Sequence, residues 1–203
     1  MTIKIQKIAN EILSLSSYDI QKLANLVKGA TSDNFKKDFL NYFNFEWFFT
    51  ARRNGALLWE ANDHNLVVNV GLQEAIIMTL LNGTQNAAWY CGLMAASPTV
   101  AAADTMASHA GWTEFTDFDE AVRQTWSGVR TGQVVTNSAS PAVYTCDTDS
   151  SSVGGGFLAS SSTLSESASD LFSAVAFTGG NKALDDDDTL DVTYQITAAD
   201  DGA

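Results

Sequence analysis

The chain has 203 residues, 45% of them hydrophobic and 17% charged, a balance that leaves room for one good-sized globular domain with its own core. The formal net charge is −13, yet eight of the eleven lysines and arginines lie within residues 1–60. No lysine or arginine lies between Arg130 and Lys182, so this part of the chain cannot neutralise phosphates, and we expect no nucleic-acid partner.

Targeting and redox signals are weak. The N-terminal stretch MTIKIQKIANEILSL lacks the continuous apolar region of a signal peptide, and no apolar run approaches the roughly 20 residues that span a bilayer. We therefore expect synthesis in the cytoplasm and no membrane partner. Cys91 and Cys146 form neither a C-x-x-C pair nor a disulfide framework, which favours reduced, packed thiols.

The first third of the chain is predicted to be a helical arm, residues 1–65. Within SSYDIQKLANLVKGA, apolar residues recur at helical spacing from Ile20 to Val27, and Gly29 is a typical helix stop. A second helix is expected from TSDNF, followed by an aromatic-rich run from Phe35 to Phe49. That aromatic surface either packs onto the chain's own second domain or anchors the arm in a neighbouring subunit or partner.

The second domain, residues 66–203, is expected to open with one helix at about 70–82, because Leu72, Ile76 and Leu80 share a helical face and Asn82-Gly83 is a stop signal. From Ala87 onward, short β-rich segments alternate with Gly, Ser, Asn and Asp. The clearest is TLDVTYQITA, in which apolar and polar residues alternate strictly. The predicted fold class is mainly β: a β-sandwich of the jelly-roll or immunoglobulin-like kind, preceded by the helical arm.

Catalytic signals are sparse. The only histidines are His64 and His109, no G-x-S-x-G, H-E-x-x-H, Walker or G-x-G-x-x-G motif occurs, and Ser108 beside His109 makes no triad. A glycosidase needs two paired carboxylates, and four acids lie close together in the sequence: Glu114, Asp117, Asp119 and Glu120. Their number alone is weak support for such an enzyme. Asp147, Asp149 and the DDDD run at 185–188 offer oxygen ligands for calcium, but a solvated acidic turn is the favoured interpretation. We predict no catalytic residues, no cofactor and no metal.

One longer stretch carries a resemblance. NVGLQEAIIMTLLNGTQNAAWYCGLMAASPTVAAADTMASHAGWTEFTDF, with NSASPAVYTC, GGGFLASSST and DDDTLDVTYQIT after it, resembles a group of small structural proteins of tailed bacteriophages, over about residues 68–198. The densest match is residues 101–116, where we expect Trp112 to point inward and Asp104, Ser108 and His109 to make turn or intersubunit hydrogen bonds. The resemblance implies a virion component with no enzymatic activity, self-assembly that is often trimeric, and attachment to a capsid lattice.

The resulting hypothesis is a capsid decoration or cement protein on the virion surface. Its partners would be the major capsid protein and other copies of the chain, most readily in a homotrimer. The expected partner contacts are Phe45, Trp47, Phe48, Arg52 and Arg53, as aromatic anchors and charge-assisted donors. Two alternatives stay open: a head or tail fibre module that binds a host surface glycan, and a small glycosidase.

Overall fold

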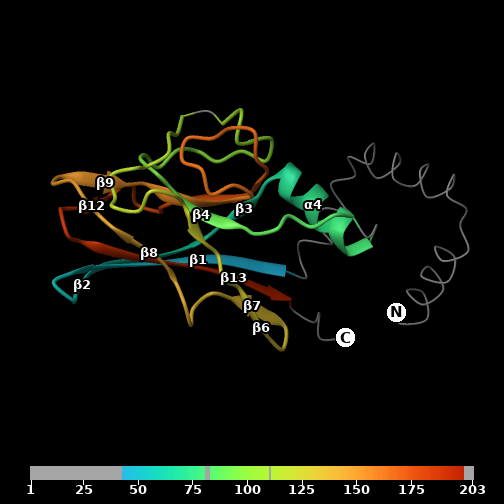
Figure 1. Cartoon of the computed structure of the whole chain (residues 1–203), viewed down its shortest axis with the longest axis horizontal. Helices are drawn as coiled ribbons and strands as arrows, with labels where there is room; N and C mark the ends of the chain where they lie inside the picture. Colours follow the sequence, from blue (N-terminus) through green and yellow to red (C-terminus); the bar gives the residue numbers. More distant parts are fainter. Residues whose placement is uncertain (1–42, 81–82, 110, 199–203) are drawn as a thin grey trace, which may run out of the picture. The chain divides into compact units, whose positions relative to one another are not determined.

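The structure is a computed structural model that describes residues 43–80, 83–109 and 111–198. The described chain is mainly β, built from antiparallel sheets with one short helix, so the mainly-β prediction is confirmed (Figure 1). The predictions for residues 1–42 lie outside the described residues. The part of the predicted helical arm that follows them is wrong, because residues 43–64 form two long strands.

The larger sheet, sheet A, has six strands, and the first and last of the described strands pair at its centre. The strand order is β2-β1-β13-β7-β6. Two short strands pair with different parts of β13: β7 with its C-terminal part, residues 195–197, and β8 with its N-terminal part, residues 189–192. Its strands are β1 (Phe43–Arg53), β2 (Ala56–His64), β6 (Val129–Thr131), β7 (Val134–Thr136), β8 (Ala142–Thr145) and β13 (Thr189–Ala198). The predicted TLDVTYQITA strand is β13.

A two-residue turn joins β1 to β2. Asn54 and Gly55 have φ values of 50° and 78°, both in the left-handed region, and Arg53 pairs with Ala56 on either side of them. Asn-Gly is the sequence that most readily adopts this conformation, whose twist matches that of a hairpin. The predicted turn at Asn54-Gly55 is therefore confirmed, but it lies within sheet A and does not separate two domains.

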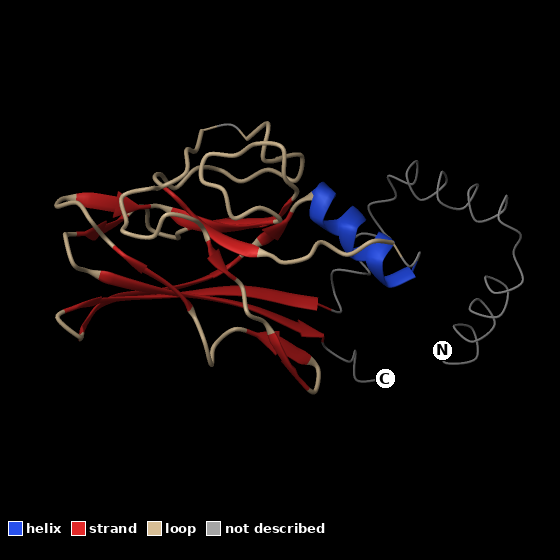
Figure 2. Cartoon of the chain, viewed as in Figure 1, coloured by secondary structure: helices blue, strands red, loops and turns tan. Residues whose placement is uncertain are grey.

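Sheet B has five strands in the order β3-β11-β10-β4-β5. They are β3 (Leu66–Val67), β4 (Tyr90–Met94), β5 (Gln124–Thr125), β10 (Gly155–Ala159) and β11 (Leu171–Ala176). A further pair, β9 (Ser151–Val153) and β12 (Lys182–Leu184), stands apart from both sheets. Figure 2 shows sheet A as the lower layer and sheet B above it.

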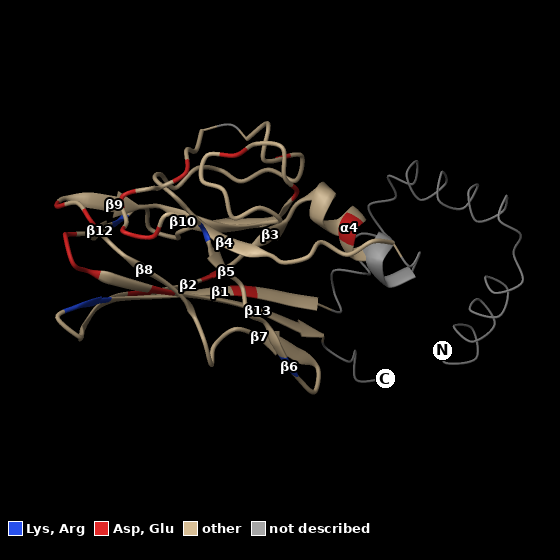
Figure 3. Cartoon of the chain, viewed as in Figure 1, with Lys and Arg blue, Asp and Glu red and all other residues tan. Residues whose placement is uncertain are grey.

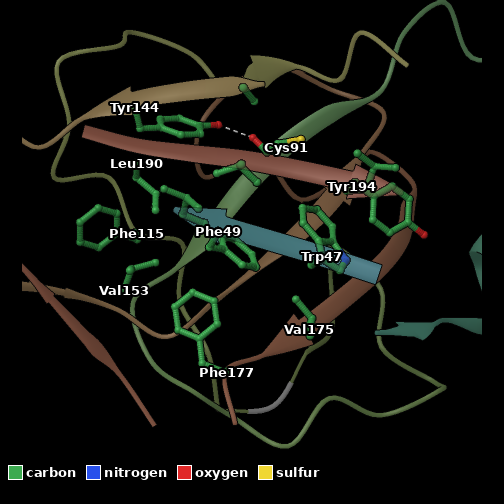
Figure 4. Packing of buried hydrophobic residues seen from close by; sticks show 14 of the residues in the cluster. Trp47, Phe49, Cys91, Phe115, Tyr144, Val153, Val175, Phe177, Leu190 and Tyr194 are labelled. Atoms are coloured by element: carbon green, nitrogen blue, oxygen red, sulfur yellow. Dashed lines mark hydrogen bonds between the residues drawn. The ribbon is translucent and has the colours of Figure 1, made fainter. Parts of the chain in front are cut away.

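One shared core lies between the two sheets. Trp47, Phe49 and Tyr194 from sheet A are fully or almost fully buried in one cluster with Leu93, Leu158 and Val175 from sheet B. Figure 4 shows Trp47, Phe49 and Val175 within this core. The ring centroids of Trp47 and Tyr194 are 4.6 Å apart, and Phe49 meets Phe177 edge-on at 4.7 Å. The hydroxyl of Tyr144 crosses the core to donate a hydrogen bond to the Cys91 carbonyl. These large side chains hold the sheets together through the apolar area that they remove from water.

The outer side of sheet B is covered as well. Phe157, Leu171 and Met94 point away from sheet A and form a second buried cluster with Met106 and Trp112, which come from the segment between β4 and β5. Consequently β10 reads as an unbroken buried run, without the alternation of a half-exposed strand. The prediction that Trp112 points inward is confirmed, and Asp104 accepts a turn hydrogen bond from the Ala101 backbone.

The helix α4 (Asn69–Leu80) confirms the helix expected at about 70–82. It lies against the start of β11, and the contact requires Gly71, since a methyl group there would lie 2.1 Å from the Phe172 carbonyl oxygen. Leu72 and Ala75 pack against the main core.

A side chain completes the hydrogen bonding of sheet A where β7 ends and β8 has not yet begun. Asn137, 1% exposed, donates to the Val192 carbonyl at 3.0 Å and accepts from the Tyr194 backbone N–H at 2.8 Å. The Asn137 amide thus stands in for a missing peptide group, and the two backbone groups of β13 are not left unpaired in the interior.

Candidate interaction face

Sheet A covers the core with one side only, and its other side is the candidate site. The strand registers define this outer face, because residues directly opposite each other in a sheet share a side. It consists of Asn44, Glu46, Phe48, Thr50 and Arg52 on β1, Leu57, Glu60, Asn62 and His64 on β2, Thr189, Asp191, Thr193, Gln195 and Thr197 on β13, and Val129, Thr131, Val134, Thr136, Val143 and Thr145 on β6 to β8. No described segment lies over this face (Figure 2).

Exposed apolar side chains concentrate on this side of the molecule. Among the residues that the structure describes, six large hydrophobic side chains are exposed. Leu57, Val129 and Val143 lie on the outer face, and Leu58 sits beside Leu57 as the extra residue of a β-bulge. A bulge changes the direction in which a strand presents its side chains, and here it places two leucines together at the end of the hairpin.

The charges on the face are few and mostly acidic. Arg52 Nε lies 3.9 Å from Asp191 Oδ2, and His64 Nε2 lies 3.9 Å from Glu46 Oε1. Glu60 has no ion-pair partner among the described residues. Because both pairs are long and at least partly solvated, they contribute little to folding stability.

Arg53 is the last residue of β1, at the edge of the outer face, and it binds the acidic turn that precedes β13. Its Nη2 lies 2.7 Å from Asp185 Oδ2 and 2.7 Å from Asp188 Oδ2, and its Nε donates to Asp188 at 2.8 Å. The Arg53 hydrogen bonds hold the pKa of Asp188 below its ordinary value, with further help from the Asp185 backbone N–H. The run at 185–188 is therefore a turn tied by an arginine, and Asp188 inside it is only 1% exposed.

The five predicted contact residues do not lie together on a surface. Phe48 and Arg52 lie on the outer face. Trp47 is fully buried, so it is not available to a partner in the folded chain, and Phe45 is partly buried and packs against the core. Arg53 is bound to the acidic turn of its own chain. The physical reason is parity: successive side chains of a strand point to opposite sides of the sheet, so no continuous run of a strand can form one contact surface.

Three of the four acids considered for a glycosidase have separate structural partners. Glu114 forms a two-point ion pair with the buried Arg123, with Nε–Oε1 at 2.6 Å and Nη2–Oε2 at 2.9 Å. Asp117 accepts from the Ser151 hydroxyl, and Glu120 accepts from the Thr145 backbone N–H. Each of these carboxylates thus holds a neighbouring part of its own chain. Figure 3 shows acidic residues in several loops and at the turn before β13.

The histidines and cysteines show no catalytic arrangement in the part of the chain that the structure describes. The His109 ring stacks on Trp112 with centroids 3.7 Å apart, and Ser108 makes a tight turn with Thr105. Burial raises the pKa of both the Cys91 and Cys146 thiols, which keeps them protonated and poorly reactive. Within the described ranges, no group of His, Cys, Asp and Glu side chains is placed to hold a metal ion.

The helix that the structure describes is too short to cross a bilayer. Comparison with known proteins identifies no relative: no family model, no curated protein and no solved structure matches the chain.

Proposed function

We propose that the two stacked sheets form a β-sandwich and that the chain is a structural virion protein of a tailed phage, a capsid decoration or cement protein that binds the major capsid lattice. The observation that carries the proposal is the outer face of sheet A, a surface without a described covering on a body whose other sheet is buried on both sides. The resemblance over residues 68–198 supplies the class of protein. In this proposal the chain assembles as a homo-oligomer, most readily a trimer.

The mechanism would be mechanical. A protein that binds only the assembled lattice stabilises that state by its binding free energy, and it opposes the separation of capsomers under internal pressure. Such a role needs a stiff body and a broad contact surface. The shared core and the second buried cluster supply the stiffness, and Phe48 and Arg52 lie on the surface that would make the contact.

The test is the copy number of this protein in purified virions, measured against the major capsid protein by quantitative mass spectrometry. We expect a ratio near one or a simple fraction of it, as lattice-wide binding requires. A few copies per particle would contradict the cement role.

One observation favours the fibre alternative. The outer face is rich in hydroxyl and amide side chains, among them Thr50, Thr193, Gln195 and Asn62 around Phe48. Such groups donate and accept hydrogen bonds with sugar hydroxyls. A low copy number together with binding to host surface glycans, lost in a Thr193→Arg variant, would favour an adhesin module over a cement protein.

A further inference from the structure

The outer face of sheet A is large enough to be a docking surface. The six strands together contain 40 residues, which at about 3.3 Å per residue along a strand and 4.8 Å between strands gives an area on the order of 600 Å². A standard protein interface removes about 800 Å² from each partner. The outer face could therefore supply most of the area of such an interface.

The edges of sheet A discourage a partner that adds a strand. The long edge strand, β2, carries the bulge at Leu57 and Leu58, and its Asp63 points inward opposite Trp47, where it accepts a hydrogen bond from the Thr178 backbone at 3.1 Å. Bulges and inward-pointing charges are common means by which natural sheets block edge pairing. The opposite edge is divided between β6 and β8, which have only three and four residues. Docking through the face is thus favoured over docking through an edge.

Charge indicates what kind of surface can cover the face. Glu46, Glu60 and Asp191 outnumber Arg52 there, and residues 43–198 as a whole contain eighteen acids against five lysines and arginines. Two of those five cations, Arg53 and Arg123, are bound to carboxylates of their own chain. A second copy of this face would bring the same negative charge, and like charges facing each other oppose association.

We infer that the outer face of sheet A docks a basic protein surface, one that presents lysine or arginine side chains around apolar groups. The apolar groups would contact Phe48, Val143, Leu57 and Leu58, and the cations would meet Glu46, Glu60 and Asp191. The inference deepens the proposed function by naming the chemistry of the partner surface, and it rests on that function only for the partner's identity.

Two exposed valines give a matched test. Val143 lies on the face and is 40% exposed, whereas Val122 lies outside sheet A, just before β5, and is 45% exposed. Val143→Lys and Val122→Lys change the net charge of the chain equally, so any difference between them reports position and not overall charge. Val143→Glu keeps the position and reverses the sign of the added charge.

The first probe is a synthetic amphipathic peptide of lysine and leucine, titrated into the full chain by calorimetry at low and at physiological salt. We expect Val143→Lys to weaken binding roughly tenfold, because it places a cation against a cation, while Val122→Lys stays within about twofold of the unsubstituted chain. Val143→Glu should bind at least as well as the unsubstituted chain. Val129→Lys, at the other side of the face, serves as a second variant if Val143→Lys lowers the urea midpoint. Equal effects of the lysine variants on and off the face would overturn the inference.

The second probe is the virion lacking this protein, to which the purified chain and its variants are added and pelleted together. If the unsubstituted chain binds and Val143→Lys does not, both the proposed function and the inference are supported. If both bind equally well, the function stands and the docking face is elsewhere. If the unsubstituted chain does not bind, the cement role fails, and the peptide titration alone decides whether the face takes a basic partner.

Discussion

The two sheets of this protein differ in how many of their sides are buried. Sheet B has the core on one side and the cluster of Phe157, Met106 and Trp112 on the other, while sheet A has the core on one side and an outer face with no described covering on the other. The strand sequences follow this difference: β10 and β11 are nearly continuous apolar and small residues, and β13 alternates. Sheet B therefore contributes side chains to two buried clusters, whereas sheet A contributes to one and leaves its other side without a described covering.

The sharpest way to break this comparison is to disturb sheet B on its covered outer side. Gly92 lies opposite Phe157, and a methyl group there would be 2.1 Å from Cζ of that ring, which Trp112 and Arg123 flank. We expect Gly92→Ala to lower the free energy of unfolding by about 3 kcal/mol or more, because a packed ring must move. Thr193→Ala, on the outer face of sheet A, should change it by less than about 0.5 kcal/mol in the same urea titration. Similar values for the two would contradict the comparison.

Two adjacent residues of β1 allow the buried side and the outer face of sheet A to be compared directly. Trp47 is fully buried, and Phe48 lies on the outer face. Trp47→Ala should cost about 4 kcal/mol of unfolding free energy through the cavity that it leaves, whereas Phe48→Ala should cost about 1 kcal/mol. Chemical denaturation of both variants measures this directly. A larger loss for Phe48→Ala would mean that a further part of the molecule covers the outer face.

A third prediction concerns Asn137, whose side chain completes the hydrogen bonding of sheet A, and an intermediate loss of folding stability is expected when it is removed. Asn137→Ala leaves the Val192 carbonyl and the Tyr194 N–H without their partner in a buried place. We expect a loss of about 2–3 kcal/mol, since each unsatisfied group costs its full desolvation. The neighbouring Ser138 is exposed, and Ser138→Ala serves as the control, with no measurable loss expected.

The smallest effect concerns the acidic turn at the rim of the face. Arg53 lowers the pKa of Asp188, so the stabilisation is present above the ordinary carboxyl pKa of about 3.9 and is lost as the pH falls through the lower folded value. In Arg53→Gln, the Asp188 pKa should rise, the stability at pH 7 should fall slightly, and the difference in stability between the two chains should shrink as the pH falls below the ordinary carboxyl pKa. Because Arg53 is 44% exposed, solvent screening keeps the effect small. Urea midpoints at several pH values between 3 and 7 measure it, and parallel profiles for the two chains would contradict the ion pair's role.

The sequence patterns predicted the alternating strand β13 and the helix α4, and misjudged the first two described strands. The alternation of Leu190, Val192 and Tyr194 and the helix after Asn69 follow from local periodicity alone. β1 was expected in the helical arm because Phe48 interrupts the alternation of Phe45, Trp47 and Phe49, so that the segment reads as uniformly aromatic. Its polar positions, Asn44, Glu46, Thr50 and Arg52, were the available signal that every second residue faces away from a core.

The candidate site was predictable only in part for a related reason. Phe48 and Arg52 were identified from residue type, but the face exists only once β1, β13 and β8 are placed side by side. Register between strands distant in the chain depends on packing of the whole core, which no local pattern encodes. The cover on sheet B was likewise unpredictable, because the segment between β4 and β5 that contributes Met106 and Trp112 has no regular secondary structure.

The pairing of β1 with β13 has a consequence for how the chain is made. Because the two strands lie near opposite ends of the described sequence and pair along ten residues, sheet A cannot close until β13 has been synthesised. Until then the aromatic strand β1 has only its hairpin partner β2, with Trp47 and Phe49 uncovered. Contacts of such sequence separation make folding slow and leave intermediates open to aggregation. Expression yield in the host should therefore depend on temperature and on chaperones, and a chain truncated before β13 should be recovered as insoluble protein.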